Sequence, residues 1–355
     1  MLAGPYCGLM LADMGAEVIK IETPEGDIGR TVSPHFVGPH NAYFASLNRN
    51  KKSVVIDLAS DEGQAALGRI ARTSHALVTN LRPSAIRKLG LTYDALRRWN
   101  ERLVCVALTG YGLDGPYADN PAYDYVIQAM TGVMALTGDP EAPPTKAGYS
   151  AVDNSAGLVA AVGLLAKIVQ GQGGQVDVAM YDVMLSQLNY LAGAALNAGE
   201  TIERLADSSH PYVVPAQIFA TADGWLTLFI THDKFWKTFC GEIGRPEWVV
   251  DRKFATMAGR RMHRAEVIVA IASVLRQASA AEWVRRLSPL GVVVAEVGTL
   301  NEALRSDIAA ARSLVVPLGD GSLPLRAVAC PIRFQEFSPV YGLPPLLDEH
   351  GDEVL

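Results

Sequence analysis

Strand-like runs alternate with helical patterns through the first half of the chain, and this alternation restricts its fold more than any other feature. Four short runs are apolar or β-branched, at residues 17–22, 53–58, 76–80 and 103–108. The stretches between them carry helical periodicity or turn residues. Strands that alternate with helices build parallel sheets whose faces the helices cover. We therefore expect an α/β fold with a Rossmann-like parallel sheet.

The second part of the chain has a different pattern. A chain of 355 residues is long for one domain, so two domains are expected. After about residue 200, a turn at 221–224 and a strand at 225–230 are followed by helical patterns and further short strands. The helices are expected at 233–243, 264–275 and 280–287, and the strands at 291–294 and 314–318. We predict a large α/β domain at 1–219 and a smaller α+β domain at 220–320.

Composition excludes several classes of protein. Hydrophobic residues make up 49% of the chain and charged residues 19%, which is typical of a soluble globular protein. The apolar stretch at 156–166 is short and rich in Gly and Ala for a membrane span, and no secretory segment opens the chain. The net charge of −6 does not indicate a nucleic-acid partner. We expect a cytoplasmic protein without a membrane partner.

The cysteines do not form a recognisable site. Cys7, Cys105, Cys240 and Cys330 are scattered, and no pair has metal-ligand or redox spacing. Neither a disulfide nor a metal site is therefore expected. Cys7 lies in a glycine-rich segment but has no histidine near it in sequence, and a reactive thiolate needs an activating partner.

Asp153 is the first candidate for chemistry. It lies in a segment of small residues, 147–157, directly before the dense apolar pattern of 158–169, which glycines at 171–174 end. The pattern predicts a buried helix of roughly 15 residues with Asp153 in its first turn. There the helix dipole favours an ionised carboxylate by roughly 0.3–1 kcal/mol. Asp153 is then an anionic nucleophile at neutral pH, or, in the alternative interpretation, an ordinary helix cap.

Several motifs occur in the order and spacing of one known family. They are Leu2-Ala3-Gly4-Pro5-Tyr6-Cys7, residues 11–22, Asn48-Arg49-Asn50-Lys51-Lys52-Ser53, Asp57-Leu58, Asn80-Leu81-Arg82-Pro83, residues 110–116, Tyr123-Asp124 and Asp153. With them the chain resembles, over its whole length, the class III CoA transferases, which include formyl-CoA transferase and the carnitine CoA transferases.

The resemblance implies an enzyme that transfers coenzyme A from an acyl-CoA thioester to a free carboxylic acid. In such an enzyme Asp153 is expected to form a covalent aspartyl anhydride and then an aspartyl-CoA thioester. Coenzyme A enters and leaves as part of the substrate and product, and no permanent cofactor is implied. Tyr123, Tyr149 and the N–H groups around Gly148 are candidates to stabilise the developing oxyanion. Asp124 caps or orients the helix that it begins.

The resemblance also implies a coenzyme A site. Residues 80–89 wrap the nucleotide in the family, and two apolar residues line the adenine. The residues carried over are Asn80, Leu81, Arg82, Ala85, Lys88 and Leu89, with Ile56 and Leu58. Arg49 and Lys52 are further candidates for phosphate contacts. Many relatives have Arg at the position of Thr23 and some have Lys at that of Ala59, so fewer cations are expected here.

Two further expectations come from the family. Its members are interlocked homodimers, and the tail at 321–355 is expected to return to the large domain. The chain starts at the motif that usually follows a first β-strand and ends before the family's last helix. We expect that either the sequence is short at its ends or the sheet lacks an edge. The acyl pocket is expected near Tyr43 and residues 208–217, with His210 as a structural loop residue.

Two other functions stay open. An α-methylacyl-CoA racemase shares the fold and the aspartate, but its chemistry needs a second acid/base group, and racemases have His where this chain has Tyr123. A tyrosine phenol has an ordinary pKa of about 10 and is a poor base at neutral pH. A coenzyme A-binding protein without turnover is the other alternative.

Overall fold

The computed structural model describes all residues, 1–355, and the chain forms two compact units. The large unit contains residues 1–132, 147–200 and 304–355, and the small unit contains 133–146 and 201–303. These boundaries differ from the expected ones at three places, the first of which is residues 133–146, which belong to the small unit. Residues 201–219 join the small unit because β8 (Ala216–Ala220) pairs with β9 (Trp225–Phe229). Residues 304–320 join the large unit, where β11 (Val315–Pro317) pairs with β12 (Arg326–Val328).

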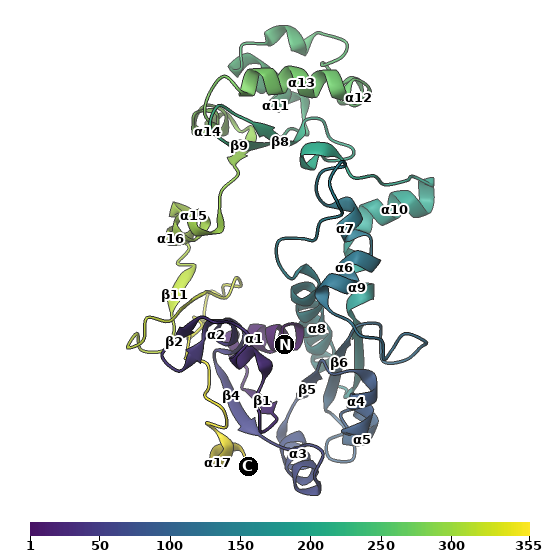
Figure 1. Cartoon of the computed structure of the whole chain (residues 1–355), viewed down its shortest axis with the longest axis vertical. Coiled ribbons are helices and arrows are strands. Elements are labelled where there is room, and N and C mark those ends of the chain that lie inside the picture. Colours follow the sequence, from purple (N-terminus) through teal and green to yellow (C-terminus); the bar gives the residue numbers. More distant parts are fainter. The chain divides into compact units, whose positions relative to one another are not determined.

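The large unit contains two parallel sheets (Figure 1). In one, β1 (Val18–Glu22) pairs with β4 (Lys51–Val55). In the other, β6 (Val104–Thr109) lies between β5 (Ala76–Thr79) and β7 (Gly174–Ala179). The four expected strands are confirmed and pair in parallel, but they form two separate sheets instead of the single sheet that was expected. The strand β7 was not predicted, because the glycines before it were interpreted only as the end of a helix.

Helices surround these strands in the large unit. The helices are α1 (Ala3–Asp13), α2 (Ala42–Asn48), α3 (Asp61–Thr73), α4 (Pro83–Lys88), α5 (Tyr93–Leu96), α6 (Asp124–Met130), α8 (Ala151–Val169), α9 (Met180–Gln187), α10 (Asn189–Ala198), α16 (Asp307–Ala311) and α17 (Gly351–Val354). A short hairpin joins β2 (Phe36–Val37) to β3 (His40–Asn41), and α15 (Leu300–Arg305) crosses the boundary between the units. Every residue of β6 is buried, so this strand forms the centre of the unit.

The helix that carries Asp153 is longer and less buried than expected. It has 19 residues and packs against α1, β6, β7 and α9. A Cβ atom at Gly157 would lie 2.7 Å from the carbonyl oxygen of Ala3, so glycine permits the close approach of α1. The opposite face is exposed within the chain, with Val162 66% and Val169 86% exposed. The expectation of a helix buried on all sides was wrong.

The same helix bears on the question of membrane spans. Among single helices, α8 alone is long and apolar enough to cross a bilayer, and 33% of its apolar window is buried. Residues 264–275 and 280–290 meet the same test only as a pair bent by 103°. The expectation that this apolar stretch is too short therefore does not hold for the helix as a whole. Within the large unit, one face of α8 packs on β6 and β7, and the opposite face is exposed.

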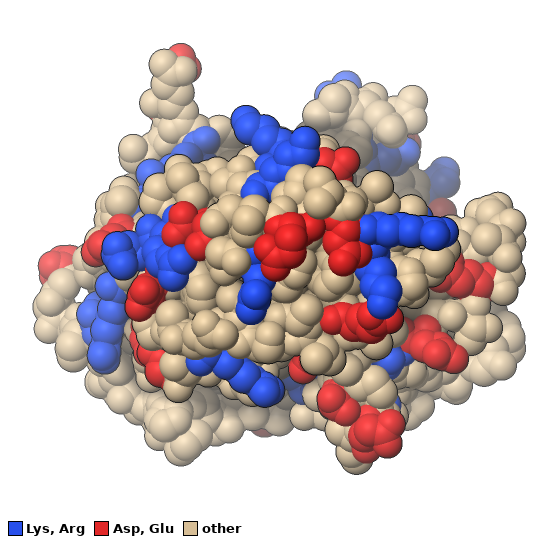
Figure 2. All heavy atoms as spheres, turned by 90° about the horizontal axis from the view of Figure 1, so that it is seen from above, with Lys and Arg blue, Asp and Glu red and all other residues tan.

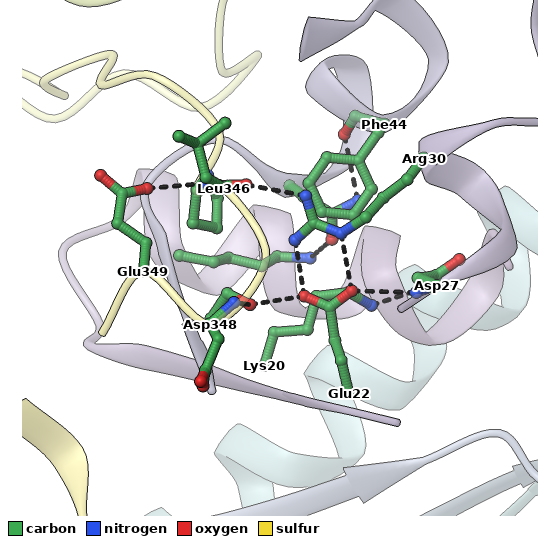
Figure 3. Close-up of polar contacts among 12 residues, drawn as sticks. Lys20, Glu22, Asp27, Arg30, Phe44, Leu346, Asp348 and Glu349 are labelled. Atoms are coloured by element: carbon green, nitrogen blue, oxygen red, sulfur yellow. Dashed lines mark hydrogen bonds and ion pairs between the residues drawn. The ribbon is translucent and has the colours of Figure 1, made fainter. Parts of the chain in front are cut away.

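The C-terminal residues lie along β4, next to the ion pairs of Arg30 with Glu22 and of Lys20 with Asp27 (Figure 3). Val55 N–H donates to Asp348 at 2.7 Å, and Asp348 N–H donates to the Ser53 hydroxyl at 3.1 Å. Arg30 donates to the carbonyl of Pro345 at 3.0 Å. These contacts give the outer edge of β4 hydrogen-bond partners, which an exposed strand edge otherwise lacks.

The small unit is an antiparallel sheet packed against helices. The strands follow the order β8, β9 and β10 (Val293–Glu296). Its helices are α7 (Val133–Leu136), α11 (Asp233–Glu242), α12 (Met257–Met262), α13 (Arg264–Leu275) and α14 (Ala280–Leu287). Aromatic stacking fills the core, where the rings of Trp236 and Trp248 lie 6.2 Å apart. Figure 2 shows basic and acidic side chains interspersed on the face that it displays, and pairs such as Lys253 and Glu266 lie in this unit.

Candidate active site

The candidate site is built at the start of α8. Asp153 lies in the first turn of this helix and is half-buried, as the pattern of small residues predicted. Asp124 begins α6 and is 6% exposed. Its Oδ2 accepts a hydrogen bond from Val152 N–H at 2.8 Å and a longer one from Asp153 N–H at 3.4 Å. Asp124 therefore caps the first turn of α8 from another helix. The N-cap residue itself, Ser150, makes no side-chain hydrogen bond to this turn.

Two negative groups at one helix end change the acidity of the nucleophile candidate. Burial, and secondly the charge of Asp124, raise the pKa of Asp153 to about 6, while the terminal amine of Met1 opposes them. The helix dipole was expected to stabilise the ionised form, but desolvation has the larger effect. At pH 7 a carboxyl group with this pKa is still ionised in a ratio of about ten to one. Asp153 is thus an anion with more basic oxygens than an ordinary aspartate.

Gln128 completes this part of the site and was not predicted from the sequence. It lies one turn after Asp124 on α6 and is fully buried. Its Nε2 donates to Asp124 Oδ1 at 2.6 Å, and its Oε1 accepts from Ala147 N–H at 2.9 Å. The spacing of four residues on a helix, with Asp followed by Gln, was the available signal.

The tyrosines differ in their relation to Asp153. The Tyr43 side chain, from α2, packs beside Gly29, and burial together with the charges of Asp153 and Asp27 raises its pKa. Tyr123 is the N-cap residue of α6 and is 67% exposed, and Tyr149 is 62% exposed. The charge of Asp153 therefore acts on the Tyr43 hydroxyl group.

The segments expected to hold coenzyme A come together in the structure. The side-chain amide of Gln64, on α3, donates to the carbonyl of Leu58 at 2.6 Å and to that of Leu89 at 3.1 Å. This bridge joins the segment after β4 to the end of α4. Ile56 is buried in a cluster with Val54. This role of Gln64 was not predicted from the sequence.

The opposite end of the same segment lies beside α1. Asn80 follows β5, and a Cβ atom at Gly4 would lie 2.9 Å from its Oδ1. Leu81 is 42% exposed, Ala85 is half-buried, and Arg82 and Lys88 are exposed without a salt bridge. Arg87, between them, pairs with Asp114 at 2.6 Å. Two cations, Arg82 and Lys88, are thus available beside this segment for a phosphate.

Two cations of the other basic cluster, Arg49 and Lys52, have carboxylate partners within the chain. Arg49 is buried and forms a double hydrogen bond with Asp13, at 3.0 Å and 2.5 Å. Lys52 pairs with Glu17 at 2.6 Å and with Glu353 at 2.5 Å. Lys51 is buried, and desolvation lowers its pKa well below the usual value. Arg49 and Lys51 are thus held inside the fold, and Asp13 occupies the Arg49 guanidinium, whereas Lys52 lies in ion pairs at the surface.

The glycine-rich loop after β6 is held from three sides. Gly112 N–H donates to the Thr109 hydroxyl at 2.9 Å, and Leu113 N–H donates to Asp177 at 2.8 Å. Arg87 donates to the carbonyl of Leu113. Gly112 has a φ of +95°, a backbone conformation that favours glycine. The loop lies at the carboxyl end of β6, where ligands bind in parallel sheets.

Cys7 and His210 are both held by their surroundings in the fold. Cys7 is fully buried, and burial raises its pKa to about 11, so its thiol is neutral. All four cysteines are free and buried. In the small unit, His210 Nδ1 accepts from the N–H groups of Tyr212 and Val213, at 3.0 Å and 3.2 Å. This geometry fits the expected role of His210 in shaping its loop.

Comparison with known proteins assigns the family. The model described as CoA-transferase family III matches residues 1–351. The chain belongs to CoA-transferase family III and is a class III CoA transferase, so the resemblance drawn from the motifs is confirmed.

Similar proteins span the whole chain. Succinate–glutarate CoA-transferase from Agrobacterium fabrum is 34% identical, over 100% of this chain and 92% of that protein. Acetyl-CoA:oxalate CoA-transferase from Acetobacter aceti is 32% identical, over 99% and 91%. The crystal structure of Rv3272 from Mycobacterium tuberculosis has a TM-score of 0.89 and 31% identity, covering 100% of this chain and 95% of that one. A CaiB/BaiF family protein from Brucella suis has a TM-score of 0.86 and 30% identity, covering 99% and 94%.

Proposed function

We propose that the protein transfers coenzyme A between an acyl-CoA and a free carboxylic acid, with Asp153 as the covalent carrier. The observation that carries this proposal is the half-buried carboxylate at the start of α8, whose pKa of about 6 leaves it ionised and more basic at neutral pH. A carboxylate attacks a thioester directly, without a base to remove a proton.

The reaction begins with the donor thioester. A carboxylate oxygen of Asp153 attacks the thioester carbonyl, the C–S bond breaks, and coenzyme A leaves as thiolate. The product is a mixed anhydride between Asp153 and the donor acyl group. The thiolate then attacks the aspartyl carbonyl, the anhydride C–O bond breaks, and the donor acid is released. Asp153 now holds coenzyme A as a thioester.

The acceptor acid reverses these steps. Its carboxylate attacks the aspartyl thioester, giving a second mixed anhydride and the thiolate. The thiolate attacks the acceptor acyl carbonyl, which forms the new acyl-CoA and restores the Asp153 carboxylate. Anhydride and thioester both hydrolyse in water, so burial of Asp153 protects them. Tyr43, Tyr123 and the N–H groups near Gly148 are the proposed donors to the oxyanion.

We assign the coenzyme A contacts to the two segments that Gln64 joins. They are Ile56, Leu58, Asn80, Leu81, Arg82, Ala85, Lys88 and Leu89. The apolar members suit the adenine, and Arg82 and Lys88 suit the phosphates because each is exposed without a salt bridge. Because similar proteins are named for succinate, glutarate and oxalate, these are the first acids to screen.

We also propose that the protein works as a homodimer in the cytoplasm, interlocked as in the family. The exposed apolar face of α8, with Val162 and Val169, supports a second copy as its cover. Four free cysteines suit a reducing compartment. Sedimentation equilibrium tests the dimer, and a monomer at micromolar concentration contradicts it.

The test of the chemistry is covalent trapping. The protein is incubated with an acyl-CoA and then with hydroxylamine or borohydride, and the peptide that contains Asp153 is analysed by mass spectrometry. Modification at Asp153 is expected in the parent and absent in Asp153→Asn. A racemase instead exchanges the α-hydrogen of the acyl group with solvent deuterium without an acceptor acid. A binding protein does neither, and either result contradicts the transferase proposal.

A further inference from the structure

A buried amide connects the two ends of the segment that leads to the nucleophile. Gln128 is fully buried on α6, with no exposed surface. It donates from Nε2 to Asp124 Oδ1 at 2.6 Å and accepts at Oε1 from Ala147 N–H at 2.9 Å. Asp124 in turn accepts from Val152 N–H at 2.8 Å. The hydrogen bonds therefore run from Ala147 through Gln128 and Asp124 to Val152.

The orientation of this amide is fixed by its partners. An ionised carboxylate only accepts hydrogen bonds, and a backbone N–H only donates. The NH₂ group of Gln128 must therefore face Asp124 and its oxygen must face Ala147. A flipped amide would place oxygen against oxygen and N–H against N–H. The bond to Gln128 also sets the rotation of the Asp124 carboxylate, which leaves Oδ2 for the N–H groups of α8.

The segment held in this way lies directly before Asp153. Ala147 and Val152, at its two ends, are both tied to α6, and Gly148 and Tyr149 lie between them. A Cβ atom at Gly148 would meet nothing within 4 Å, so no neighbouring group crowds that position. The hydrogen bonds that Ala147 and Val152 donate to side chains of α6 hold both ends of this segment next to the nucleophile.

The geometry points to Gln128 as a positioning residue for the reaction of Asp153, acting through Asp124 and Ala147. This inference rests on the proposed function, because it assumes that Asp153 carries the acyl group. The role requires no contact between Gln128 and the substrate. It fixes the direction of the Asp153 backbone and of the N–H groups that precede it, and small misplacements at a reacting centre cost on the order of 10²-fold in rate.

The effect should appear in kcat and in its pH dependence. The charged and titratable groups that act on Asp153 are Asp124 from α6, the terminal amine of Met1 and, through its own pKa, Tyr43 from α2. Gln128 has no charge, so it changes the acid limb of the pH profile of kcat only by changing the position of the Asp124 carboxylate. The coenzyme A segments joined by Gln64 do not depend on Gln128, so KM for the acyl-CoA should change little.

The experiment compares Gln128→Ala and Gln128→Glu with the parent. In Gln128→Ala we expect kcat to fall by a factor on the order of 10² with KM within threefold, and the acid limb to move to lower pH as Asp124 loosens. In Gln128→Glu a carboxyl group donates to Asp124 only when protonated. The ratio of its kcat to that of the parent should therefore rise as pH falls from 8 to 5. Gln277→Ala, on the exposed part of the small unit, is the matched control and should behave as the parent.

The outcomes separate the two proposals. Trapping at Asp153 in the parent is measured first, and its failure overturns the proposed function. If the parent is trapped, and Gln128→Ala keeps kcat within twofold or Gln128→Glu keeps a constant ratio at all pH values, the positioning role is overturned alone. Should Gln128→Ala not fold, Gln128→Glu keeps the volume of the side chain and decides the question by its pH profile.

Discussion

Two carboxylates of the large unit are held in opposite ways. Glu22 is buried, and its oxygens accept from Arg30 at 2.7 and 2.8 Å, from the Ser53 hydroxyl at 2.7 Å and from Asp27 N–H at 3.0 Å (Figure 3). Burial alone raises its pKa, but these donors outweigh burial and lower it. Asp153 has no salt bridge, and burial and the charge of Asp124 raise its pKa to about 6.

The difference separates a charge that holds the fold from a charge kept for chemistry. Glu22 uses its lone pairs in hydrogen bonds and joins β1, β4 and the C-terminal residues through Arg30 and Ser53. A carboxylate held in this way is a weak nucleophile. The lone pairs of Asp153 stay basic, but its partly buried charge lowers the stability of the folded state. The predictions below test this division, beginning with the largest effect.

Replacement of the nucleophile should have the largest effect. In Asp153→Asn we expect kcat to fall by at least about 10³-fold, because the amide cannot form the anhydride. Exchange of coenzyme A between two acids, followed by chromatography, measures this. Retention of parental exchange with a folded Asn variant would remove Asp153 from the mechanism.

The same variant should gain stability at neutral pH. The folded-state pKa of Asp153 is raised above its unfolded value, so its charge opposes folding above pH 6, and this effect disappears as pH falls below about 4. We therefore expect Asp153→Asn to melt at a higher temperature than the parent at pH 7 and at the same temperature near pH 4. Scanning calorimetry at both pH values measures the difference.

Breaking the Glu22 network should affect stability and spare chemistry. Arg30→Met removes a guanidinium that is paired with a buried carboxylate and lies 3.9 Å from the Phe44 ring centre. Loss of one partner of a buried ion pair costs about 3 kcal/mol of unfolding free energy. We expect this loss in urea unfolding, with kcat of the remaining folded enzyme within a few-fold of the parent.

An exposed ion pair gives the control for this experiment. Lys253→Met breaks the pair with Glu266 in the small unit, where both side chains face solvent. Exposed pairs contribute little, so the urea midpoint should not move measurably. Equal midpoints for Arg30→Met and Lys253→Met would show that the Glu22 network does not hold the fold.

A smaller effect is expected when the neighbour of Asp153 loses its charge. The acid limb of kcat should have its midpoint near pH 6, where Asp153 ionises. In Asp124→Asn the negative charge that helps to raise this pKa is gone, so the limb should move to lower pH. A limb that stays in place would assign the shift to burial alone.

The division between the two carboxylates was partly visible in the sequence. The strands and Asp153 in the first helical turn follow from local patterns, because hydrophobic period and small residues report on neighbours in the chain. The pairing of Arg49 with Asp13 joins residues 36 apart, and no local pattern says which cation finds a buried partner. For this reason Arg49 and Lys52 were considered as phosphate ligands, although Arg49 is buried against Asp13 and Lys52 pairs with carboxylates at the surface.

The bridging amides were hidden for the same reason. Gln64 joins two backbone carbonyls from different segments, and Gln128 joins the Ala147 N–H to the Asp124 carboxylate. The spacing of Asp124 and Gln128 on one helix is a local signal, but it does not reveal the partner from the other segment. The half-exposed face of α8 was also hidden, because a dense apolar sequence looks alike whether its cover comes from the same chain or from a partner. What local patterns miss is thus the identity of the distant partner.

The smallest expected effect concerns the coenzyme A segments. Gln64→Ala removes the amide that joins the carbonyls of Leu58 and Leu89, so the two segments should lose their fixed spacing. We expect KM for the acyl-CoA to rise about three- to tenfold, which is the loss of one or two modest hydrogen bonds, with kcat little changed. Steady-state kinetics with the donor varied measures this. Because Gln128→Ala is expected to lower kcat and spare KM, the two glutamine variants should give opposite kinetic patterns, and the same pattern in both would show that the nucleotide segments and the nucleophile are not held independently.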